Sequence, residues 1–412
     1  MTDIRRVLVI RPSKEREAGL RTLARSGAEI IVADHPDNDF AGFADRQLLL
    51  PRVPAAARAG ELGRLEARVL EFHAWYPLTA VMADFDYLLP LVGRINERTG
   101  LRGHTEASGL TCSNKRLQRA ALERAEVPQP RWASGGDAGA AREFAKIVGW
   151  PVVVKPTDRA ASCAVSVVRD RDALQAALAA ALDESWERGA MIEEYLGGPE
   201  FSVEAIVAGG RVTTVAVTGK RIGGRTGTLK LDAEIPAPLS DEDREAVTRV
   251  AAHAVLACGL LDGPAHTEIR LTADGPRVIE VNGRVGGVFI SHMVQAVTGV
   301  DLYQAWYDLL HGQDPELEVA QRGHAVRRCI ADVQGLVESV EIGELSEAAA
   351  RAHLVTRCFV RPGDRLAPAG NGNQMQAAVV AFGSERDRVV EAAEQLAANL
   401  RIRTIEAAGA AG

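Results

Sequence analysis

Apolar and polar positions along the first hundred residues alternate in the way that strands and helices require. The apolar run RRVLVI, residues 5–10, predicts a short buried strand, and residues 14–35 predict a helix, a glycine turn and a second strand. Strand, helix and strand in this order indicate a parallel sheet with helices on its faces. The pattern continues to about Gly103, so we expect an N-terminal α/β domain. No GxGxxG follows the first strand, and a dinucleotide-binding domain would therefore lack its phosphate loop.

A second unit begins near Ser113, which we expect to be the N-cap of an amphipathic helix. Two apolar strands follow that unit's next helix, at residues 151–156 and 164–170, and a strongly amphipathic helix comes after them. Further along, the chain predicts a meander with a hairpin turn at Gly209-Gly210. This region therefore predicts a pair of partner strands and a meander, separated by helices.

The last two fifths of the chain begin with a long helix over residues 241–260, followed by two strands. Two more helices follow Gly287. Strand and helix patterns alternate again from about residue 321 to 402, which predicts a closing domain. The Ala/Gly tail AAGAAG, residues 407–412, is typical of a frayed terminus.

Composition and charge narrow the class of protein. A chain of 412 residues is too long for one compact core, so we expect two to four domains or subdomains. The net charge of −7 comes from interspersed acids and bases, which does not favour a nucleic-acid-binding or polybasic membrane surface. The first apolar run is too short for a signal peptide, and no apolar segment approaches the ~20 residues that span a bilayer. The five cysteines are scattered without a CxxC pair, which fits a cytoplasmic protein.

The clearest chemical signal lies in RVIEVNGRVGGVF, residues 277–289. Apolar strands on either side of residues 273–275 predict a hairpin, and a glycine in third position favours a three-residue loop. In that register Glu268 lies directly opposite Glu280, and Asn282 lies on the same face. A two-residue loop would instead place the two glutamates on opposite faces.

The predicted pairing of two carboxylates requires an explanation, because like charges facing each other destabilise a sheet. Together with an amide oxygen they suit Mg²⁺, which prefers hard oxygen ligands and keeps positions for phosphates. The alternative is that both glutamates point to solvent and repel weakly. Arg284 favours the metal interpretation, because a guanidinium just beyond the carboxylates suits an acyl or phosphoryl anion held on the metal.

These residues carry a resemblance to a known family. Glu268, followed twelve residues later by EVNGR (280–284), resembles the metal-binding end of the ATP-grasp superfamily. The wider EVNGRVGG is similar to that of its carboxylate–amine ligases, the group of the bacterial L-amino acid (dipeptide) ligases. The resemblance covers most of the chain to about residue 312 and implies an α/β (α+β) ATP-grasp fold. Its implied parts are a Rossmann-like N-terminal domain (1–104), a small lobe with linker helix (105–198), a large lobe (199–320) and a C-terminal domain that completes the large lobe (321–412).

The resemblance also implies an ATP site. Two family lysines that bind phosphates match Lys115 and Lys155, each of which would otherwise be an ordinary solvated lysine. The family's hinge matches MIEEYLGGPEFSVE, where backbone groups pair with adenine and an acid accepts the ribose hydroxyls. The implied hinge residues are Glu193, Glu194, Tyr195 and Leu196, with Glu200 at the ribose.

One segment departs from the family pattern. The phosphate-covering loop after the second lysine is usually glycine-rich, whereas PTDRAASCAVSVV, residues 156–168, contains no glycine. Ser162 and nearby N–H groups are the candidates to cover phosphates there. Loss of glycine's conformational freedom puts loop closure, and with it efficient catalysis, in question.

The implied activity is ATP-dependent ligation of a carboxylate to an amine. Mg²⁺, or Mn²⁺ in its place, is held by Glu268, Glu280 and Asn282; Arg284 and Lys220 act on the acyl phosphate that forms before the amine displaces phosphate. Lys220 has the alternative of a solvated loop residue, and His292 is expected to be a packed helix residue. The implied partners are small carboxylate and amine substrates of the amino-acid class, with no nucleic acid and no membrane, and the assembly most common among soluble proteins is the homodimer.

Two other functions are compatible with the same residues. One is an ATP-grasp enzyme with a different acceptor, either biotin carboxylase-like or a purine-biosynthetic ligase, since a similar metal and arginine set occurs there. The other is a protein that binds ATP without turnover, which the glycine-poor loop suggests. No zinc-protease HExxH, serine-hydrolase GxSxG or Walker-type phosphate loop occurs in the chain.

Overall fold

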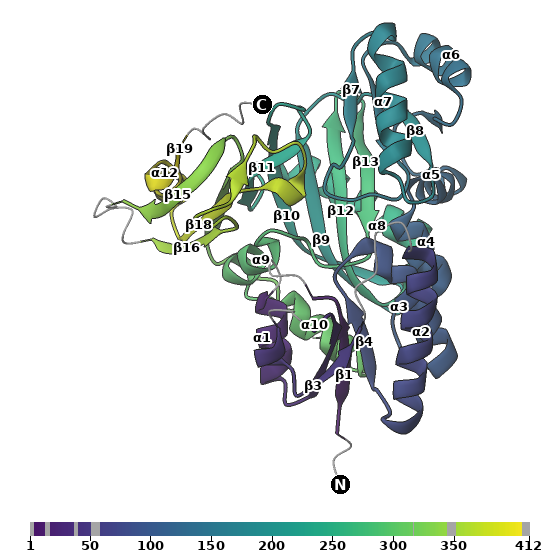
Figure 1. Cartoon of the computed structure of the whole chain (residues 1–412), viewed down its shortest axis with the longest axis vertical. Helices are drawn as coiled ribbons and strands as arrows, with labels where there is room; N and C mark the ends of the chain where they lie inside the picture. The colour runs from purple at the N-terminus through teal and green to yellow at the C-terminus, as the bar shows by residue number, and fades with distance from the viewer. Residues whose placement is uncertain are drawn as a thin grey trace, which may run out of the picture.

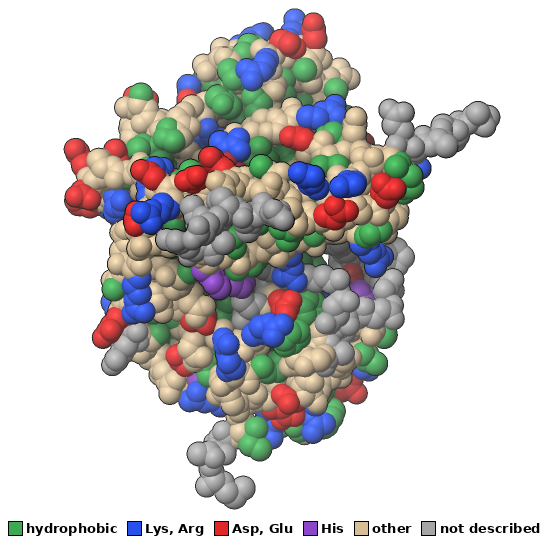
Figure 2. Space-filling model, turned by 90° about the vertical axis from the view of Figure 1, so that its left-hand side faces the viewer, with side chains coloured by type: hydrophobic (Ala, Val, Ile, Leu, Met, Phe, Trp, Pro, Cys, Tyr) green, Lys and Arg blue, Asp and Glu red, His purple; other side chains and the backbone are tan. Residues whose placement is uncertain are grey.

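The computed structural model describes residues 4–12, 17–36, 40–50, 58–315, 317–343 and 352–405. The expected frayed tail at 407–412 lies outside the described residues. Figure 1 shows three α/β parts around a central twisted sheet, with the N-terminal part at the bottom of the view and the C-terminal part at the left. Figure 2 shows lysine and arginine interspersed with acidic side chains over one face. None of the helices in the described part of the chain combines the length and apolar character needed to cross a bilayer.

The N-terminal part is the parallel sheet that the sequence predicts. Its strands have the order β3-β2-β1-β4, and every neighbouring pair is parallel. Helices α2 and α3 pack on one face of the sheet, while α1 and the distant α10 pack on the other (Figure 1). The elements are β1 Arg6–Ile10, α1 Glu17–Arg25, β2 Glu29–Asp34, β3 Arg46–Leu49, α2 Arg58–Trp75, β4 Ala80–Ala83 and α3 Leu89–Thr99, with short 3₁₀ turns at Ala41–Phe43 and Asp86–Leu88.

Two consecutive helices, α4 Glu106–Ser113 and α5 Lys115–Arg124, lead from this part into the next. The expectation that Ser113 caps α5 is wrong. Asn114 is the N-cap, and its side-chain oxygen accepts from the N–H groups of Arg116 and Leu117 at 3.1 and 3.2 Å. Ser113 still belongs to α4, and its hydroxyl donates back to the C=O of Leu110 at 3.3 Å. An amide at the cap satisfies two otherwise unpaired N–H groups, which a serine one residue earlier does not reach.

The small lobe is an antiparallel sheet with the order β5-β8-β6-β7. Its outer face is covered by two alanine-rich helices, which bury Val152 and Val154 of an inner strand. The alternating residues Val153 and Lys155 belong to the opposite face, which lines a cavity. The elements are β5 Trp132–Ser134, α6 Ala138–Val148, β6 Val152–Pro156, β7 Ser166–Val168, α7 Arg171–Glu184 and β8 Ala190–Glu194.

The central sheet has eight antiparallel strands in the order β13-β12-β9-β10-β11-β14-β18-β16. Helix α8 packs against one face of its first half, and α9 and α10 connect it to the N-terminal part. Its elements are β9 Glu200–Ala208, β10 Arg211–Gly223, β11 Leu229–Ile235, α8 Asp241–Ala257, β12 Gly263–Thr272, β13 Gly275–Asn282, α9 Ile290–Thr298, α10 Leu302–Leu310, β14 His324–Ile330, β16 His353–Cys358 and β18 Ala377–Gly383.

The C-terminal region contributes three of those strands and a separate three-stranded sheet, β17-β15-β19. This second sheet consists of β15 Gly335–Ile342, β17 Arg365–Leu366 and β19 Leu400–Ile405, and helix α12 Arg386–Asn399 packs beside β18 and β14. A 3₁₀ turn spans Gly372–Gln374. The predicted closing region therefore extends the central sheet, while the domain boundaries at 104, 198 and 320 stay predictions.

The hairpin between β12 and β13 has a different loop from the one expected. Thr272 pairs with Gly275, so the loop has two residues, Ala273 and Asp274. The Thr272 hydroxyl stabilises this tight turn by accepting from the N–H of Asp274 at 3.2 Å and donating to the C=O of Gly275 at 2.8 Å. The three-residue register was therefore wrong.

A β-bulge nevertheless restores the predicted pairing of the glutamates. The register shifts after Ile269–Val278, Ile279 is left as the extra residue, and Glu268 then pairs with Glu280. Without the bulge, Glu268 would face Ile279 and Glu280 would lie on the other face of the sheet.

A second bulge acts on the neighbouring hairpin. The register between β10 and β11 shifts after Arg221–Asp232, so that Ile222 pairs with Lys230 and Leu231 is the extra residue. Lys230 is thereby turned to the face that carries Glu268. Two irregularities of the sheet thus direct charged side chains to one place.

Candidate active site

Two adjoining cavities meet at the paired glutamates. The first lies between the small lobe and the central sheet, and the second lies between the central sheet, the N-terminal part and the C-terminal segment around Gly372. Both are lined by Ala160, Ala161, Ser162, Lys230, Glu268 and Glu280. The first cavity is lined besides by every residue expected to contact ATP, namely Lys115, Lys155, Glu193, Glu194, Tyr195, Leu196 and Glu200.

Glu268 is the centre of a charged cluster. Lys230 donates to its two oxygens at 2.6 and 2.7 Å, and Lys220 donates to Oε1 at 3.1 Å. Burial alone would raise the pKa of Glu268, but the two ammonium groups hold it well below the ordinary value of 4.5. Burial lowers the pKa of Lys220, opposed by the Glu268 charge. With Glu268 5% exposed, the alternative of a solvated glutamate is excluded.

Behind this cluster His266 and Glu204 form a buried pair. Nδ1 of His266 lies 2.7 Å from a Glu204 oxygen, and Nε2 lies 3.2 Å from the Lys220 ammonium. Ser202 and Thr218 also donate to Glu204, at 2.8 and 3.3 Å. The carboxylate thus orients the imidazole, whose second nitrogen can accept from Lys220. His266 precedes Glu268 by two residues, so strand periodicity was a signal that could have identified it.

Glu280 is paired across the first cavity with a lysine of α5. Nζ of Lys115 lies 2.8 Å from Glu280 and donates to the C=O of Arg159 at 2.5 Å. Lys115 is the first residue of its helix, where the positive end of the helix dipole adds to its charge. It is therefore no solvated surface lysine.

Lys155 belongs to a buried triad in the same cavity. Its ammonium lies 2.7 Å from Glu193, whose other oxygen lies 2.7 Å from Nε of Arg119. Burial would raise the pKa of Glu193, but Arg119 and Lys155 lower it to about 2. Burial lowers the pKa of Lys155, an effect that Glu193 opposes. Arg119 carried no signal in the sequence, because an arginine within an amphipathic helix is typical of an exposed face.

The expected hinge lines the first cavity. Tyr195 is partly exposed and Leu196 is buried, while the Glu194 side chain turns toward Arg131 at 3.1 Å. Glu200 pairs with Arg270 through one oxygen at 3.1 Å. Its other oxygen, Oε1, is buried and has no hydrogen-bond partner among the described residues. An unpaired buried acceptor is costly, and a ligand hydroxyl would satisfy it.

The glycine-poor loop adopts glycine-like conformations with other residues. Ala161, Ser162 and Ala164 have φ values of 56°, 58° and 50°. The N–H of Gly372 donates to the C=O of Ala161 at 2.7 Å. The Ser162 hydroxyl, expected to cover phosphates, donates instead to the C=O of Thr228 at 3.1 Å. The loop is therefore held against the central sheet and the C-terminal segment without glycine.

Arg284 faces the second cavity from the end of β13. Its Nη2 lies 2.7 Å from Asp86 and 3.2 Å from the Asn282 oxygen. Burial lowers the pKa of this guanidinium, but the Asp86 charge outweighs it and raises the pKa above the ordinary value. Nε of Arg284 and Oδ1 of Asp86 are buried without partners in the described residues. Asp86 was not identified from the sequence, because it lies nearly 200 residues before Arg284, in the N-terminal part.

The donor set at the glutamate pair fits a magnesium–nucleotide complex. Among the described residues, no group of three or more His, Cys, Asp and Glu side chains is arranged to hold a metal ion by itself. Glu268 and Glu280 face each other on neighbouring strands, and Asn282 lies two residues beyond Glu280. All three side chains offer hard oxygen ligands. Mg²⁺ is typically bound by one or two carboxylates plus substrate phosphates, so this incomplete set fits the ion together with ATP.

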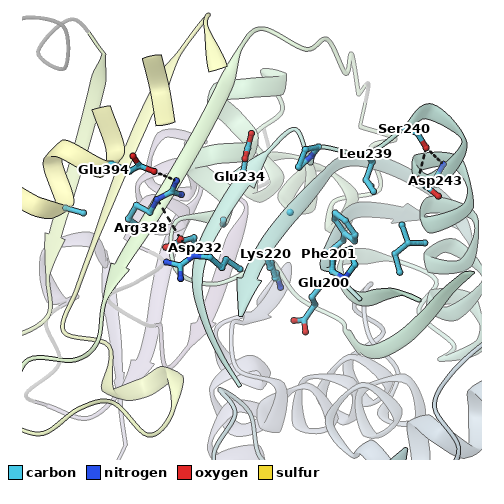
Figure 3. A pocket seen from close by; sticks show the side chains of 17 residues that line it. Glu200, Phe201, Lys220, Asp232, Glu234, Leu239, Ser240, Asp243, Arg328 and Glu394 are labelled. Carbon is cyan, nitrogen blue, oxygen red and sulfur yellow. Dashed lines mark hydrogen bonds and ion pairs between the residues drawn. The ribbon is translucent and has the colours of Figure 1, made fainter. Parts of the chain in front are cut away.

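A third cavity lies on the opposite face of the central sheet, between α8 and α12. Figure 3 shows Arg328, Asp232 and Glu394 on one side of it and Ser240 with Asp243 on the other. Arg328 lies 3.7 Å from Asp232 and 3.5 Å from Glu394, so these charges neutralise one another. Glu200, whose Oε1 is unpaired, lines this cavity as well as the first; none of the other described residues that line it has an unpaired buried polar side-chain atom.

Comparison with known proteins agrees with this geometry. Residues 148–292 match the family model of the ATP-grasp domain. An uncharacterized protein y4rH of Sinorhizobium fredii is 29% identical over 316 residues, which cover 76% of this chain and 65% of that protein. Human carnosine synthase 1 is 32% identical over 143 residues, or 34% of this chain and 17% of that enzyme. The chain thus spans about two thirds of the first relative and about a sixth of the second.

A solved structure gives the fold over nearly the whole chain. An L-amino acid ligase from Bacillus licheniformis superposes with a TM-score of 0.84 at 22% identity, covering 98% of this chain and 100% of that one. Identity at that level supports the fold alone. The chain therefore contains an ATP-grasp domain and has the fold of the ATP-grasp superfamily.

Proposed function

We propose that the protein is an ATP-dependent carboxylate–amine ligase that forms an amide bond through an acyl phosphate, with release of ADP and phosphate. The observation that carries the proposal is the Glu268–Glu280 pair at the junction of the two cavities. One cavity holds the residues suited to ATP, and the other holds Arg284 and Asp86, suited to a small polar substrate. A γ-phosphate at the junction would reach into the second cavity.

In this proposal the first cavity binds ATP. Lys115 and Lys155 neutralise phosphate oxygens, the hinge at residues 193–196 receives adenine, and Glu200 accepts a ribose hydroxyl with its unpaired oxygen. Glu268, Glu280 and Asn282 hold Mg²⁺, or Mn²⁺ in its place. When bound, the ion neutralises phosphate charge during transfer. Lys115, which pairs with Glu280, and Lys155, which pairs with Glu193, would then bind phosphate oxygens.

The second cavity orients the acceptor. Arg284 binds the substrate carboxylate and stabilises the negative charge that develops on it, and Lys220 and Lys230 neutralise the transferred phosphoryl group. The carboxylate attacks the γ-phosphorus, ADP leaves, and an amine then displaces phosphate from the acyl phosphate. No protein nucleophile is required, because positioning and charge neutralisation lower the barrier.

The decisive experiment supplies ATP and Mg²⁺ with amino acids, singly and in pairs, and follows ADP and phosphate together with product mass. The expected result is release only with a productive pair, and a product lighter by one water than the sum of the two. ATP cleavage that depends on bicarbonate or on a phosphoribosyl amine would support a different acceptor. ATP binding without release under every condition would support a non-catalytic protein.

A further inference from the structure

The outward edge of β13 is bonded by side chains of α5, and at Val278 by the C=O of Pro128 at 2.9 Å, instead of by another strand. β13 is the last strand of the central sheet, so its outward N–H and C=O groups have no strand partner. Oε1 of Gln118 accepts from the N–H of Val281 at 2.9 Å, and Nε2 donates to the C=O of the same residue at 2.7 Å. Gln118 is buried, and its side-chain amide makes the two backbone hydrogen bonds that a residue of a neighbouring strand would otherwise make.

The next residue of α5 bonds the bulge itself. Nη2 of Arg119 donates to the C=O of Ile279 at 2.6 Å, and Nη1 donates to that of Val278 at 3.3 Å. Ile279 is the extra residue of the bulge and has no paired residue on β12. Its carbonyl needs a partner outside the ladder, and the buried guanidinium supplies it.

We propose that Gln118 and Arg119 are positioning residues for the divalent cation. They bind β13 on either side of Glu280 and hold the bulged register that turns this carboxylate toward Glu268. If the strand slipped by one residue, Glu280 would move to the opposite face. The inference rests on the proposed function, because it takes the two glutamates as metal ligands. Neither positioning residue is itself a ligand.

The test is Mn²⁺ binding by the full-length protein loaded with ATP, measured by electron paramagnetic resonance. Partners that orient metal ligands typically contribute about 10- to 100-fold to affinity, so Gln118→Met is expected to weaken Mn²⁺ binding about tenfold. ATP binding measured in EDTA should change less than about twofold, because Lys155 and the hinge keep their contacts. A merely structural role would lower thermal stability without separating these two affinities.

The chain offers a closely matched control. Oε1 of Gln376 accepts from the N–H of Val333 at 3.0 Å, and Nε2 donates to the C=O of Val333 at 2.7 Å, the same pattern as Gln118 with Val281. Gln376→Met therefore removes the same kind of bonds from a buried site away from the two glutamates. It should lower the melting temperature similarly and leave the Mn²⁺ affinity unchanged. Equal Mn²⁺ affinities in the two variants would overturn the proposal.

A second variant covers the case in which Gln118→Met does not fold. Arg119→Lys keeps a cation for Glu193 but cannot serve both carbonyls at the bulge, so it should also weaken Mn²⁺ more than metal-free ATP. Unchanged Mn²⁺ binding in this variant would contradict the positioning role. Glu280→Gln distinguishes a wrong metal site from a wrong positioning inference. If Glu280→Gln leaves Mn²⁺ binding intact, the metal site itself is wrong. If Glu280→Gln loses Mn²⁺ binding while Gln118→Met does not, only the positioning inference is rejected.

Discussion

Lys230 donates to both carboxylate oxygens of Glu268, from a strand position that only a bulge turns toward that carboxylate. The lysine lines both cavities, and the Glu268 and Glu200 charges outweigh burial and raise its pKa, so it stays protonated at neutral pH. A permanent cation at the junction is suited to a phosphoryl group passing from one cavity to the other.

The first prediction concerns this lysine. Lys230→Met should lower kcat for ADP formation by about 100-fold, which corresponds to about 2.7 kcal/mol of transition-state stabilisation. Lys230→Arg should retain more activity because it keeps the positive charge. Steady-state kinetics with a productive substrate pair would measure both, and equal rates in wild type and Lys230→Met would exclude a role in phosphoryl transfer.

The second prediction concerns the opposing glutamate. Glu280→Gln removes one carboxylate from a like-charged pair and should abolish turnover, by about 100-fold or more, while the fold is retained. The Lys115 ammonium, now paired with Glu280 at 2.8 Å, would lose its charged partner. Circular dichroism and thermal melting check the fold, and ADP release checks the activity. Full activity in this variant would refute the metal assignment.

The glutamate pair also shows how far the sequence could predict the site. The spacing of Glu268 and Glu280 led to the right pairing through the wrong loop, because the two-residue turn and the bulge at Ile279 each shift the register by one residue. A bulge has no reliable signature in a single sequence, so Lys230 could not be assigned to this face. Strand and helix patterns, by contrast, are local, and they predicted the parallel N-terminal sheet and the hairpin turn at Gly209-Gly210 correctly.

Other parts of the site depend on contacts between distant segments. Asp86 meets Arg284, and Arg119 meets Glu193, only after segments far apart in the sequence pack together. The residue types alone carry no information on these partners. Lys155 was identified through the family resemblance, whereas its burial against Glu193 was not foreseeable from the sequence.

The third prediction is a pH dependence of stability that Glu193 contributes. The pKa of Glu193 is about 2 in the folded protein, against 4.5 for the unpaired group. Glu193 binds its proton more tightly in the unfolded chain than in the folded protein. The stabilisation from its ionised form is therefore complete above about pH 4.5 and is lost as the pH falls toward 2. The difference corresponds to about 3 kcal/mol of unfolding free energy. Urea unfolding of the wild type and Glu193→Gln from pH 2.5 to 5 should show a flatter curve for the variant, and parallel curves would contradict the assignment.

The last prediction concerns the loop without glycine. Ala161 has a φ of 56°, where a Cβ costs about 1 kcal/mol and a β-branched side chain costs more. Ala161→Gly relieves that strain but adds entropy to the unfolded chain, so its unfolding free energy should stay within about 0.5 kcal/mol of wild type. Ala161→Val should lose about 1–2 kcal/mol and raise KM for ATP, because the loop leaves its contact with Gly372. Urea unfolding with ATP kinetics tests both. Because Ala161→Gly restores the flexibility of glycine, a large rise in its kcat would mean that loop stiffness limits turnover, whereas an unchanged kcat would mean that this loop does not need glycine to work.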